Sequence, residues 1–519
     1  MKKNYLLLIF CFITYFTNAQ APFITTWQVS GSDLTIQLQI FEVDELPDNF
    51  TIDFGDGTVL TNQSGTVTHT FNNEGIYTVS MSGEFSCIML GYNGDYNHEL
   101  LTVDQWGDTQ WTSMQGTFYN CVNLNITATD TPDLTQVENM SSMFLGASSL
   151  NQSLNDWDVA SVVNMNSMFY GASSFNQPLD NWNVSNVIDM SHMFAGATSF
   201  NQSLNDWNVS NLIYTTYMFQ GATSFNGFLN NWDVSSVTHM PYMFQGASSF
   251  NKPLDNWDVS NVLDMRHMFF KASSFNQSLN SWDVSNVTNL RQMFLEASSF
   301  NQPLNNWDVS NVIDMGSMFY KASSFNQPLN SWDVSNVVNM EGTFTDANEF
   351  DQDISNWTFN NNVNFAVSSA NGHFIDGSSL SINNYDTLLN RFKELGLENK
   401  NIGAEGLQYC DEETRDYLIN ELGWVIEGDS LAEDCTATTE LFSTDQLSIY
   451  PNPVNNILHI DTKSGVQLEA VTIYNLQGSQ LIQQSQDFEN INTESLSSGI
   501  YILSIQTNIG SAEYKLIKN

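Results

Sequence analysis

The chain has 519 residues, of which 14% are charged, whereas an average globular protein has about 25%. The 57 Asp and Glu residues outnumber the 14 Lys and Arg residues, so the net charge is −43, and no Lys or Arg lies between Lys3 and Lys252. This composition argues against nucleic acid and anionic lipid head groups as partners, because both are bound through basic patches.

Residues 1–19 have the pattern of a secretory signal peptide. Lys2 and Lys3 precede a short apolar run at 5–16, and small residues follow up to Ala19. The run is too short to span a bilayer. We therefore expect cleavage after Ala19 and an exported mature chain without a membrane span.

Residues 20–100 are predicted to form β-strands. The strings TIDFGDG at 51–57, HTF at 69–71 and GIYTV at 75–79 resemble the PKD family. The resemblance implies an immunoglobulin-like β-sandwich at the N-terminus of the mature chain.

Residues 101–375 contain a repeat of 25 residues. A period of this length indicates a solenoid, in which stacked coils complete each other's core and backbone hydrogen bonds. Trp106 and Trp111 precede the first complete coil and are expected to seal its open end. The repeat is marked by nine tryptophans at a constant interval: Trp157, Trp182, Trp207, Trp232, Trp257, Trp282, Trp307, Trp332 and Trp357.

The apolar positions of one coil predict its local structure. The segment 154–159 fits a short strand, and the segment 165–172 has apolar residues at i, i+3, i+4 and i+7, which fits one or two helical turns. A strand on one side and a helical turn on the other is the arrangement of leucine-rich repeats. The Met-x-x-Met-Phe string is predicted to pack in the core rather than to bind Cu(I), because Thr215 or Leu290 replaces one Met without loss of the pattern.

An asparagine column recurs with the same period. A buried Asn can bond the backbone of its own coil and of the next one, which prevents its replacement by an apolar residue. The column contains Asn151, Asn176, Asn201, Asn226, Asn251, Asn276, Asn301 and Asn326, with Asp351 in the last coil.

Aspartates follow Trp in five successive coils and are the candidate metal ligands. At a spacing of about 4.8 Å, neighbouring carboxylates repel each other by about 1 kcal/mol even in water. Either an Asx turn, in which each carboxylate accepts a backbone N–H, or calcium bound between coils could offset the repulsion. We favour the turn, because Asn183 and Asn208 occupy the same column. The five residues are Asp233, Asp258, Asp283, Asp308 and Asp333.

The region from 114 to 357 resembles the BspA-like leucine-rich-repeat surface proteins. The resemblance rests on the recurring strings Met-Phe, Ala-Ser-Ser-Phe-Asn-Gln and Asn-Trp-Asp-Val-Ser-Asn-Val. It implies exposure at a bacterial surface and a role in attachment or recognition, and it implies no chemistry.

Positions that vary between coils are not required by the fold, so they are the candidate ligand-binding positions. Exposed aromatic residues on a rigid surface suit recognition of a glycan or a protein, and neutral surface variation is the alternative. One varying column contains Asn164, Asp189, Tyr214, His239, Asp264, Asn289, Asp314 and Asn339. A second column provides the ligand-binding candidates Tyr170, Phe270, Leu295 and Tyr320.

Residues 376–440 are predicted to form a helical cap and a linker. Apolar stripes at 385–395 and 418–422 end at Gly396 and Gly423 respectively. Export permits disulfides, and the predicted pair is Cys410 with Cys435, although spacing alone does not fix connectivity.

Residues 441–519 alternate as strands do. The strings LSIYPNP at 447–453, VTIYN at 471–475 and KLIK at 515–518 resemble the C-terminal sorting domain of type IX secretion. The resemblance implies a Bacteroidetes-type bacterium, passage across the outer membrane to the cell surface or the medium, and removal of the tail by a sortase-like peptidase of the secretion machinery.

No catalytic or cofactor-binding residue is predicted, and calcium is the one cofactor left open. The seven histidines do not form a pair with metal-binding spacing, and the sequence contains no G-x-S-x-G string. A hydrolase would need paired carboxylates in a cleft, whereas the acidic residues here recur with the period of the repeat.

The predicted fold is mainly β with short helical turns. A leucine-rich-repeat-like solenoid is flanked by an N-terminal immunoglobulin-like β-sandwich and a C-terminal β-sandwich sorting domain. The predicted function is non-enzymatic adhesion or recognition of a protein or glycan through the solenoid face. The alternatives are a glycan-binding accessory protein for polysaccharide use and, last, a hydrolase.

Overall fold

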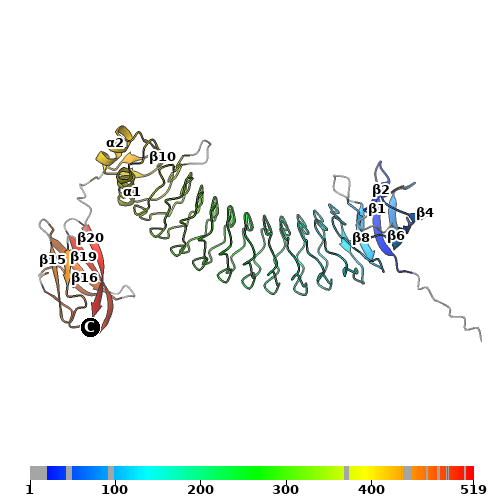
Figure 1. Ribbon diagram of the computed structural model, residues 1–519, viewed down its shortest axis with the longest axis horizontal. Coiled ribbons are helices and arrows are strands. Elements are labelled where there is room, and N and C mark those ends of the chain that lie inside the picture. Colours follow the sequence, from blue (N-terminus) through cyan, green and yellow to red (C-terminus); the bar gives the residue numbers. More distant parts are fainter. Residues whose placement is uncertain are drawn as a thin grey trace, which may run out of the picture. The chain divides into compact units, whose positions relative to one another are not determined.

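The computed structural model describes residues 20–41, 49–91, 99–366, 373–433, 435, 447–462, 466–475, 480–486, 488, 490–507 and 510–519. The predicted signal peptide lies outside these residues. The chain divides into two compact units, Met1–Ser430 and Leu431–Asn519 (Figure 1). Within the described ranges strands predominate over two helices, and neither helix is long and apolar enough to cross a membrane.

The N-terminal part of the first unit contains two β-sheets. The larger sheet has the strand order β4-β3-β6-β1-β8-β9, and the smaller one has the order β5-β2-β7. Along β1 the buried residues alternate with more exposed ones, as expected for strands with one face on a core. The strands are β1 Phe23–Val29, β2 Thr35–Ile40, β3 Asn49–Asp53, β4 Val59–Gln63, β5 Val67–Thr70, β6 Gly75–Glu84, β7 Ile88–Met89, β8 Leu100–Gln105 and β9 Asn125–Ile126.

The larger sheet continues into the first coil. Strand β9 belongs to the coil and pairs in parallel with β8, which places Val103 opposite Ile126. Trp106 and Trp111 are fully buried at this junction. The Trp106 ring contacts that of Trp157 at 5.3 Å. The two tryptophans therefore cover the open end of the first coil, as the sequence predicts.

Successive coils of the repeat are joined by a column of parallel bridges. The bridges run from Asn139–Asn164 to Asn339–Asn364 without a break. The bridged residues are those of the first varying column, so this column varies in side chain while its backbone is fixed by the neighbouring coils.

The predicted local structure of the coil is wrong in two places. The segment 154–159 contains a turn and no strand, and the segment 165–172 forms tight turns instead of α-helix. Alternate N–H groups of the second segment donate to carbonyl groups of the next coil. The Ser167 N–H donates to Ser191 O (2.8 Å) and the Phe169 N–H to Met193 O (2.9 Å). Bonding between coils replaces the i−4 bonds that a helix needs, while the apolar spacing of a helix is kept.

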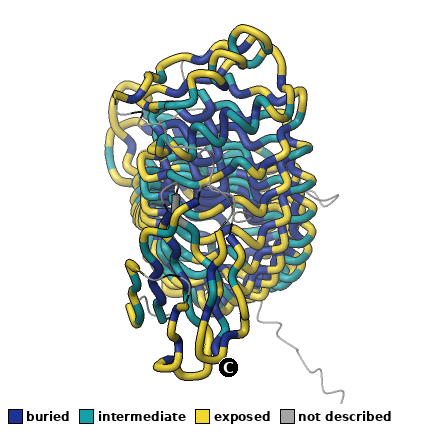
Figure 2. The backbone as a smooth tube through the Cα atoms, turned by 90° about the vertical axis from the view of Figure 1, so that its left-hand side faces the viewer, coloured by how far each residue is buried: buried dark blue, intermediate teal, exposed yellow. Residues whose placement is uncertain are grey.

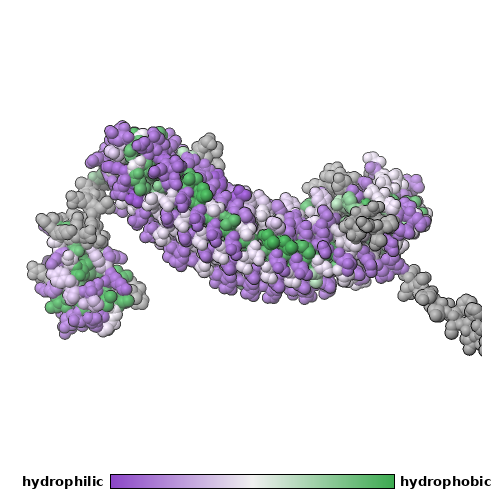
Figure 3. All heavy atoms as spheres, viewed as in Figure 1, coloured by the Kyte–Doolittle hydropathy of each residue, from purple (hydrophilic) through white to green (hydrophobic). Residues whose placement is uncertain are grey.

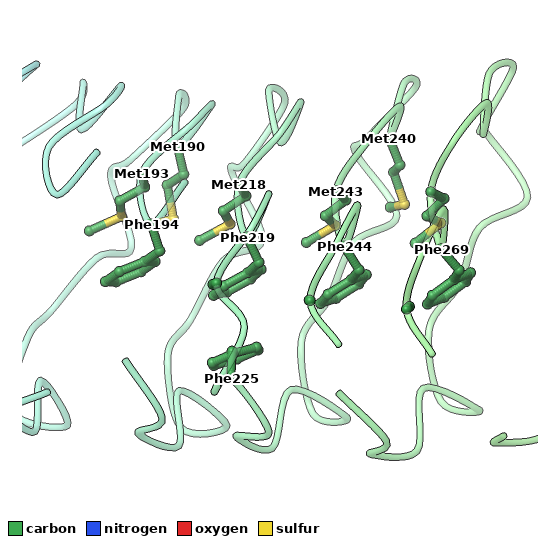
Figure 4. Packing of buried hydrophobic residues seen from close by; sticks show 14 of the residues in the cluster. Met190, Met193, Phe194, Met218, Phe219, Phe225, Met240, Met243, Phe244 and Phe269 are labelled. Atoms are coloured by element: carbon green, nitrogen blue, oxygen red, sulfur yellow. The ribbon is translucent and has the colours of Figure 1, made fainter. Parts of the chain in front are cut away.

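Each coil buries the same set of apolar side chains. Figure 2 shows buried residues along the inside of the coils and exposed residues along the outside. Figure 4 shows the Met and Phe columns of successive coils in register. The Phe219 ring stacks on Phe225 of its own coil at 4.1 Å and on Phe244 of the next coil at 5.5 Å. One coil cannot exclude water from such a core, so neighbouring coils stabilise each other.

Two polar columns tie the coils together. The Trp232 Nε1–H donates to the carbonyl oxygen of Leu204 (2.7 Å), and the other tryptophans from Trp182 to Trp357 repeat this bond. The Asn226 N–H donates to the side-chain oxygen of Asn201 (2.7 Å). The asparagine column is half-buried or exposed rather than buried, and its bonds to the next coil are those predicted.

A helical cap ends the first unit. Helix α1 (Ile382–Leu395) buries Tyr385, Leu388, Leu389 and Phe392, and Gly396 ends it in the left-handed conformation, as predicted. Helix α2 (Glu412–Asn420) ends earlier than the apolar stripe that continues to Leu422. Two small sheets complete the cap, formed by β10 Asn401–Gly403 with β12 Val425–Glu427 and by β11 Gln408–Tyr409 with β13 Ser430–Leu431.

The second unit has a core of its own. Its buried residues include Val454, Val471, Ile473, Leu503 and Leu516. The strand orders are β14-β15-β18 in one sheet and β17-β16-β19-β20 in the other. The strands are β14 Leu447–Tyr450, β15 Ile457–Thr462, β16 Leu468–Tyr474, β17 Gln480–Gln484, β18 Ile491–Asn492, β19 Gly499–Thr507 and β20 Gly510–Lys518.

Candidate functional site

The distance between equivalent rings of two neighbouring coils changes around the coil. The rings of Tyr217 and Tyr242 are 4.3 Å apart. Phe219 and Phe244 in the same two coils are 5.5 Å apart, and Trp207 and Trp232 are 6.4 Å apart. The coils therefore converge on the tyrosine side and fan out on the tryptophan side. In a solenoid such a tilt per repeat makes the converging side concave.

Four aromatic residues form a continuous stack on this concave side, which we call the ring ladder: His192, Tyr217, Tyr242 and His267. Their ring centroids are 4.7, 4.3 and 4.4 Å apart, and the rings are inclined by 13–22°. All four side chains are half-buried. The stack spans four consecutive coils, and at one end of it the Nδ1 atom of His267 is buried.

The ladder residues occupy an unusual backbone position. Their φ angles are 58–62°, in the left-handed region that bulky residues rarely adopt. Neighbouring coils have the same positive φ with Ser167, Gln292 or Ser317 in this position. The backbone is thus imposed by the coil. Because Ser and Gln fit equally well, the aromatic residues are not needed for the fold.

Stacking accounts for part of the stability of the ladder. The left-handed conformation costs roughly 1–2 kcal/mol per residue, and each aromatic contact contributes about 0.5–1.5 kcal/mol. The two terms are similar in size. Because Ser167, Gln292 and Ser317 have the same positive φ, this cost is common to all of these coils, and stacking is the term that distinguishes the ladder coils.

The imidazoles at the two ends of the ladder are held towards the neutral form. Burial lowers the pKa of His192, and the nearby Asp189 acts in the opposite sense. Burial is also the main cause that lowers the pKa of His267, with Arg291 and Arg266 adding to it, whereas Gln292 and Asp264 oppose it. Burial and the neighbouring Tyr242 raise the pKa of Tyr217. These pKa shifts favour the uncharged forms of His192, His267 and Tyr217.

Two of the predicted ligand-binding residues extend the ladder. Tyr170 is 42% exposed, and its ring lies 6.3 Å from His192. The Phe270 ring lies 5.6 Å from His267. Tyr320 is half-buried in a later coil, with the Lys321 ammonium group 5.0 Å from its ring centroid. The fourth candidate differs from the other three, since Leu295 is only 7% exposed.

The bridged column adds a further aromatic residue to the concave side. Tyr214 is 56% exposed, the most exposed tyrosine among the large apolar residues of the described coils. It bridges to His239 in the next coil. The aromatic surface formed by the ring ladder and Tyr214 is therefore widest at the coils that contain Tyr217 and Tyr242.

The five candidate calcium ligands each form an Asx turn. Asp233 Oδ1 accepts the Ser235 N–H at 3.1 Å, and the other four aspartates accept the equivalent N–H at 3.0–3.1 Å. Hydrogen bonds from Ser260 and Ser310 lower the pKa of Asp258 and Asp308. Among the residues that the structure describes, no three His, Cys, Asp or Glu side chains are placed to hold a metal ion. The carboxylates are thus used by the turn.

The cysteines fall into two groups. Cys410 and Cys435, the predicted pair, are disulfide-bonded. Cys87 and Cys121 are buried, and burial strongly raises the pKa of Cys121. A buried thiol with a raised pKa is a poor nucleophile.

Sequence analysis missed the ring ladder. The seven histidines were tested only for metal-binding spacing, and Tyr217 and Tyr242, which lie between His192 and His267 at the same 25-residue interval, were not joined to them. The signal was the unbroken run of rings at 192, 217, 242 and 267, flanked by Ser167 and Gln292.

Three families match parts of the chain. A repeat family described as "Mycoplasma protein of unknown function, DUF285" matches residues 112–228, 212–294 and 277–379, which together span just over half of the chain. A PKD domain matches residues 18–84, and a secretion system C-terminal sorting domain matches residues 448–519. No curated protein matches the chain.

These matches confirm both predicted flanking domains. The sorting domain means that a secretion system handles the chain and exports it to the cell surface or the extracellular space. The match over the coils is to a repeat family, which agrees with the 25-residue period.

Proposed function

This chain belongs to the DUF285 repeat family, and from its sorting domain and the ring ladder we propose that it is a non-enzymatic recognition protein of the cell surface or the medium. Its concave coil face attaches to a protein or glycan. We also propose that the coils are related to BspA-like leucine-rich repeats, on the strings quoted above, and that a sortase-like peptidase removes the sorting domain.

The ring ladder is the observation that carries the proposal. Four successive coils have His or Tyr in a left-handed backbone position where the adjacent coils have Ser or Gln. Tyrosine-rich surfaces suit recognition, because tyrosine supplies a large amphipathic contact at a low cost in conformational entropy. The concave side of a stack is also the side on which several coils can contact one ligand.

The acidic residues favour binding over catalysis. A glycoside hydrolase needs two carboxylates on opposite sides of a cleft. The recurring aspartates of this chain instead each accept an N–H from their own turn, as Asp283 does from Ser285 at 3.1 Å. Their arrangement follows the repeat, and it supports a structural role.

Replacement of the ladder by serine tests the proposal. We expect mature wild-type chain to bind at least one component of arrays of glycans and extracellular proteins. The Tyr217→Ser/Tyr242→Ser variant should bind that component at least about 10-fold more weakly, since buried aromatic contacts contribute 2 kcal/mol or more. Serine already occupies this position in Ser167 and Ser317, so the coils should fold normally.

The control is the thermal unfolding of the two proteins, in which the variant should remain folded at the assay temperature and lose no more than about 0.5–1.5 kcal/mol for each of the three ring contacts removed. Equal affinities of wild type and variant for the same component would contradict recognition through the ladder. Turnover of any glycan or peptide by the mature chain would contradict the non-enzymatic part of the proposal.

A glycan-binding accessory role is the second candidate. It is favoured by a groove with aliphatic and amide walls on the coil stack, lined by Ile188, Ile213, Asn186 and Asn211 among others.

A further inference from the structure

A groove runs across several coils next to the bridged column. It has a volume of about 600 Å³ and is lined by Glu138, Ser161, Val163, Asn186, Ile188, Asn211 and Ile213. These residues come from two columns of the repeat, one aliphatic and one of Asn or Ser. In the sequence the same two columns continue through the later coils, so the residue types that line the groove recur once per coil.

The side chains of the aliphatic column are partly exposed, so they are not needed to fill the core. Its exposed aliphatic side chains from Ile188 to Val338 are exposed by 36–49%, and Figure 3 shows a row of apolar patches along the visible face of the coils. Thr occupies the position in two coils, at Thr238 and Thr288. The exposed aliphatic members of the column are Ile188, Ile213, Leu263, Ile313 and Val338.

The opposite wall of the groove is held rigid by hydrogen bonds. The Asn186 side-chain N–H donates to Ala160 O and that of Asn211 to Ser185 O, both at 2.8 Å. The equivalent bond recurs in later coils, for example from Asn261 to Ser235 O at 2.9 Å. Binding therefore costs little side-chain entropy on this wall, because the amides are already fixed.

The groove is nearly neutral in a strongly acidic chain. Glu138 is the one charged residue among its seven lining residues. The aliphatic column contains no charged residue from Val163 to Val338, although the chain as a whole has a net charge of −43. A polyanion would be repelled by that charge. A cation would find no carboxylate in the groove beyond Glu138.

We propose that this groove binds a neutral, unbranched polysaccharide that runs along the coils. A sugar ring has an apolar C–H face for the aliphatic wall and hydroxyl groups for the amide wall. A linear polymer repeats these groups along its length, as the groove does. The site lies in different columns from the ring ladder, so this inference does not depend on the proposed role of the ladder.

An extended peptide fits the groove less well. Peptides that add to a sheet edge are held by free backbone groups. Here the backbone of the aliphatic column is already used: the Ile188 N–H donates to Val163 O at 2.9 Å and the Ile213 N–H to Ile188 O at 3.0 Å. The groove thus offers side chains and not a strand edge.

Affinity gel electrophoresis of the mature chain tests the proposal. Gels contain a soluble neutral glucan, mannan, xylan or galactan, or the acidic polymers alginate and pectate. We expect retardation by at least one neutral polymer and by neither acidic one. The Ile188→Ser/Ile213→Ser variant should lose at least 10-fold in affinity, whereas Tyr217→Ser/Tyr242→Ser should keep it. Oligosaccharides of six units should compete at least 10-fold better than those of two, because they span more coils.

Several results would overturn the proposal. The first is that no neutral polymer retards the chain, and the second is that the acidic polymers retard it more strongly than the neutral ones. The third is that the Ile188→Ser/Ile213→Ser variant is retarded as strongly as the wild type. The fourth is that short and long oligosaccharides compete equally well. Loss of array binding in the ladder variant with unchanged polysaccharide retardation would support both sites. Loss of retardation in the ladder variant alone would assign the polysaccharide to the ladder and remove it from the groove.

Discussion

The coils that contain the ring ladder and the coils on either side of them share one core and differ at the surface. Phe194 and Phe219 of the ladder coils stack as Phe294 and Phe319 do outside it, at 5.6 and 5.7 Å. At the left-handed position, however, Tyr217 and Tyr242 contrast with Ser167 and Ser317. The comparison teaches that the core fixes the backbone of every coil, and that the surface residue is then free to serve binding.

The core that the two sets of coils share should respond most strongly to mutation. Phe219→Ala removes a fully buried ring that contacts rings of its own and the next coil. We expect a loss of about 3–5 kcal/mol in the free energy of unfolding, measured by thermal unfolding. Tyr217→Ser, two residues away, is the matched control and should change stability far less. Similar losses for the two variants would break the distinction between core and ladder.

Extension of the ladder into the preceding coil would sharpen the comparison. In Ser167→Tyr the new ring should stack on His192, since the backbone there already has a φ of 56°. We expect a gain of about 0.5–1.5 kcal/mol from the contact, reduced by the cost of a bulky residue in this conformation. Thermal unfolding measures the change. A loss above 2 kcal/mol would show that the coils do differ in backbone.

The two histidines should make the ladder coils more sensitive to mild acid than their neighbours. Burial lowers the folded-state pKa of His192 and His267, so the unfolded chain binds more protons as the pH falls below about 6.5. Above that pH the two histidines do not lower the free energy of unfolding. That free energy falls as the pH drops through the folded-state pKa values of His192 and His267.

The control for this effect is His192→Gln/His267→Gln, because Gln292 occupies the same column. The variant should unfold at a temperature that depends less on pH between 7.5 and 5.5. An unchanged pH dependence would exclude the histidines as its source.

Calcium should have the smallest effect, and the same effect on both sets of coils. The aspartates after Trp already accept N–H groups in Asx turns. We expect no shift in the unfolding temperature when millimolar calcium replaces a chelator. A rise of several degrees would restore the calcium interpretation of Asp233 and its equivalents.

The sequence was sufficient for the parts of the fold that depend on period and composition. The tryptophan interval predicted the coils, and the apolar stripe before Gly396 predicted helix α1. The local structure of a coil was not predictable in the same way, because the N–H groups of 165–172 bond to the next coil, a partner that local spacing does not reveal.

The candidate site was predictable only in part. Tyr170 and Phe270 were found because they vary within a column, and both contact the ladder. Leu295 was included for the same reason, but it is only 7% exposed, and variation alone does not reveal the exposure of a side chain. The ladder depends on the bend of the stack, which brings rings from different coils to within 4.7 Å.

The parallel bridges have a consequence for how the length of such a stack of coils can change. Each coil contacts its neighbours through the same bridges and the same columns, so a duplicated or deleted stretch of 25 residues leaves every remaining junction intact. Length can therefore be altered in whole steps by unequal recombination, while the curvature, which is set by the difference between the tyrosine and tryptophan sides, stays constant. An organism could in this way match the span of its binding face to the size of a target without redesigning a single contact.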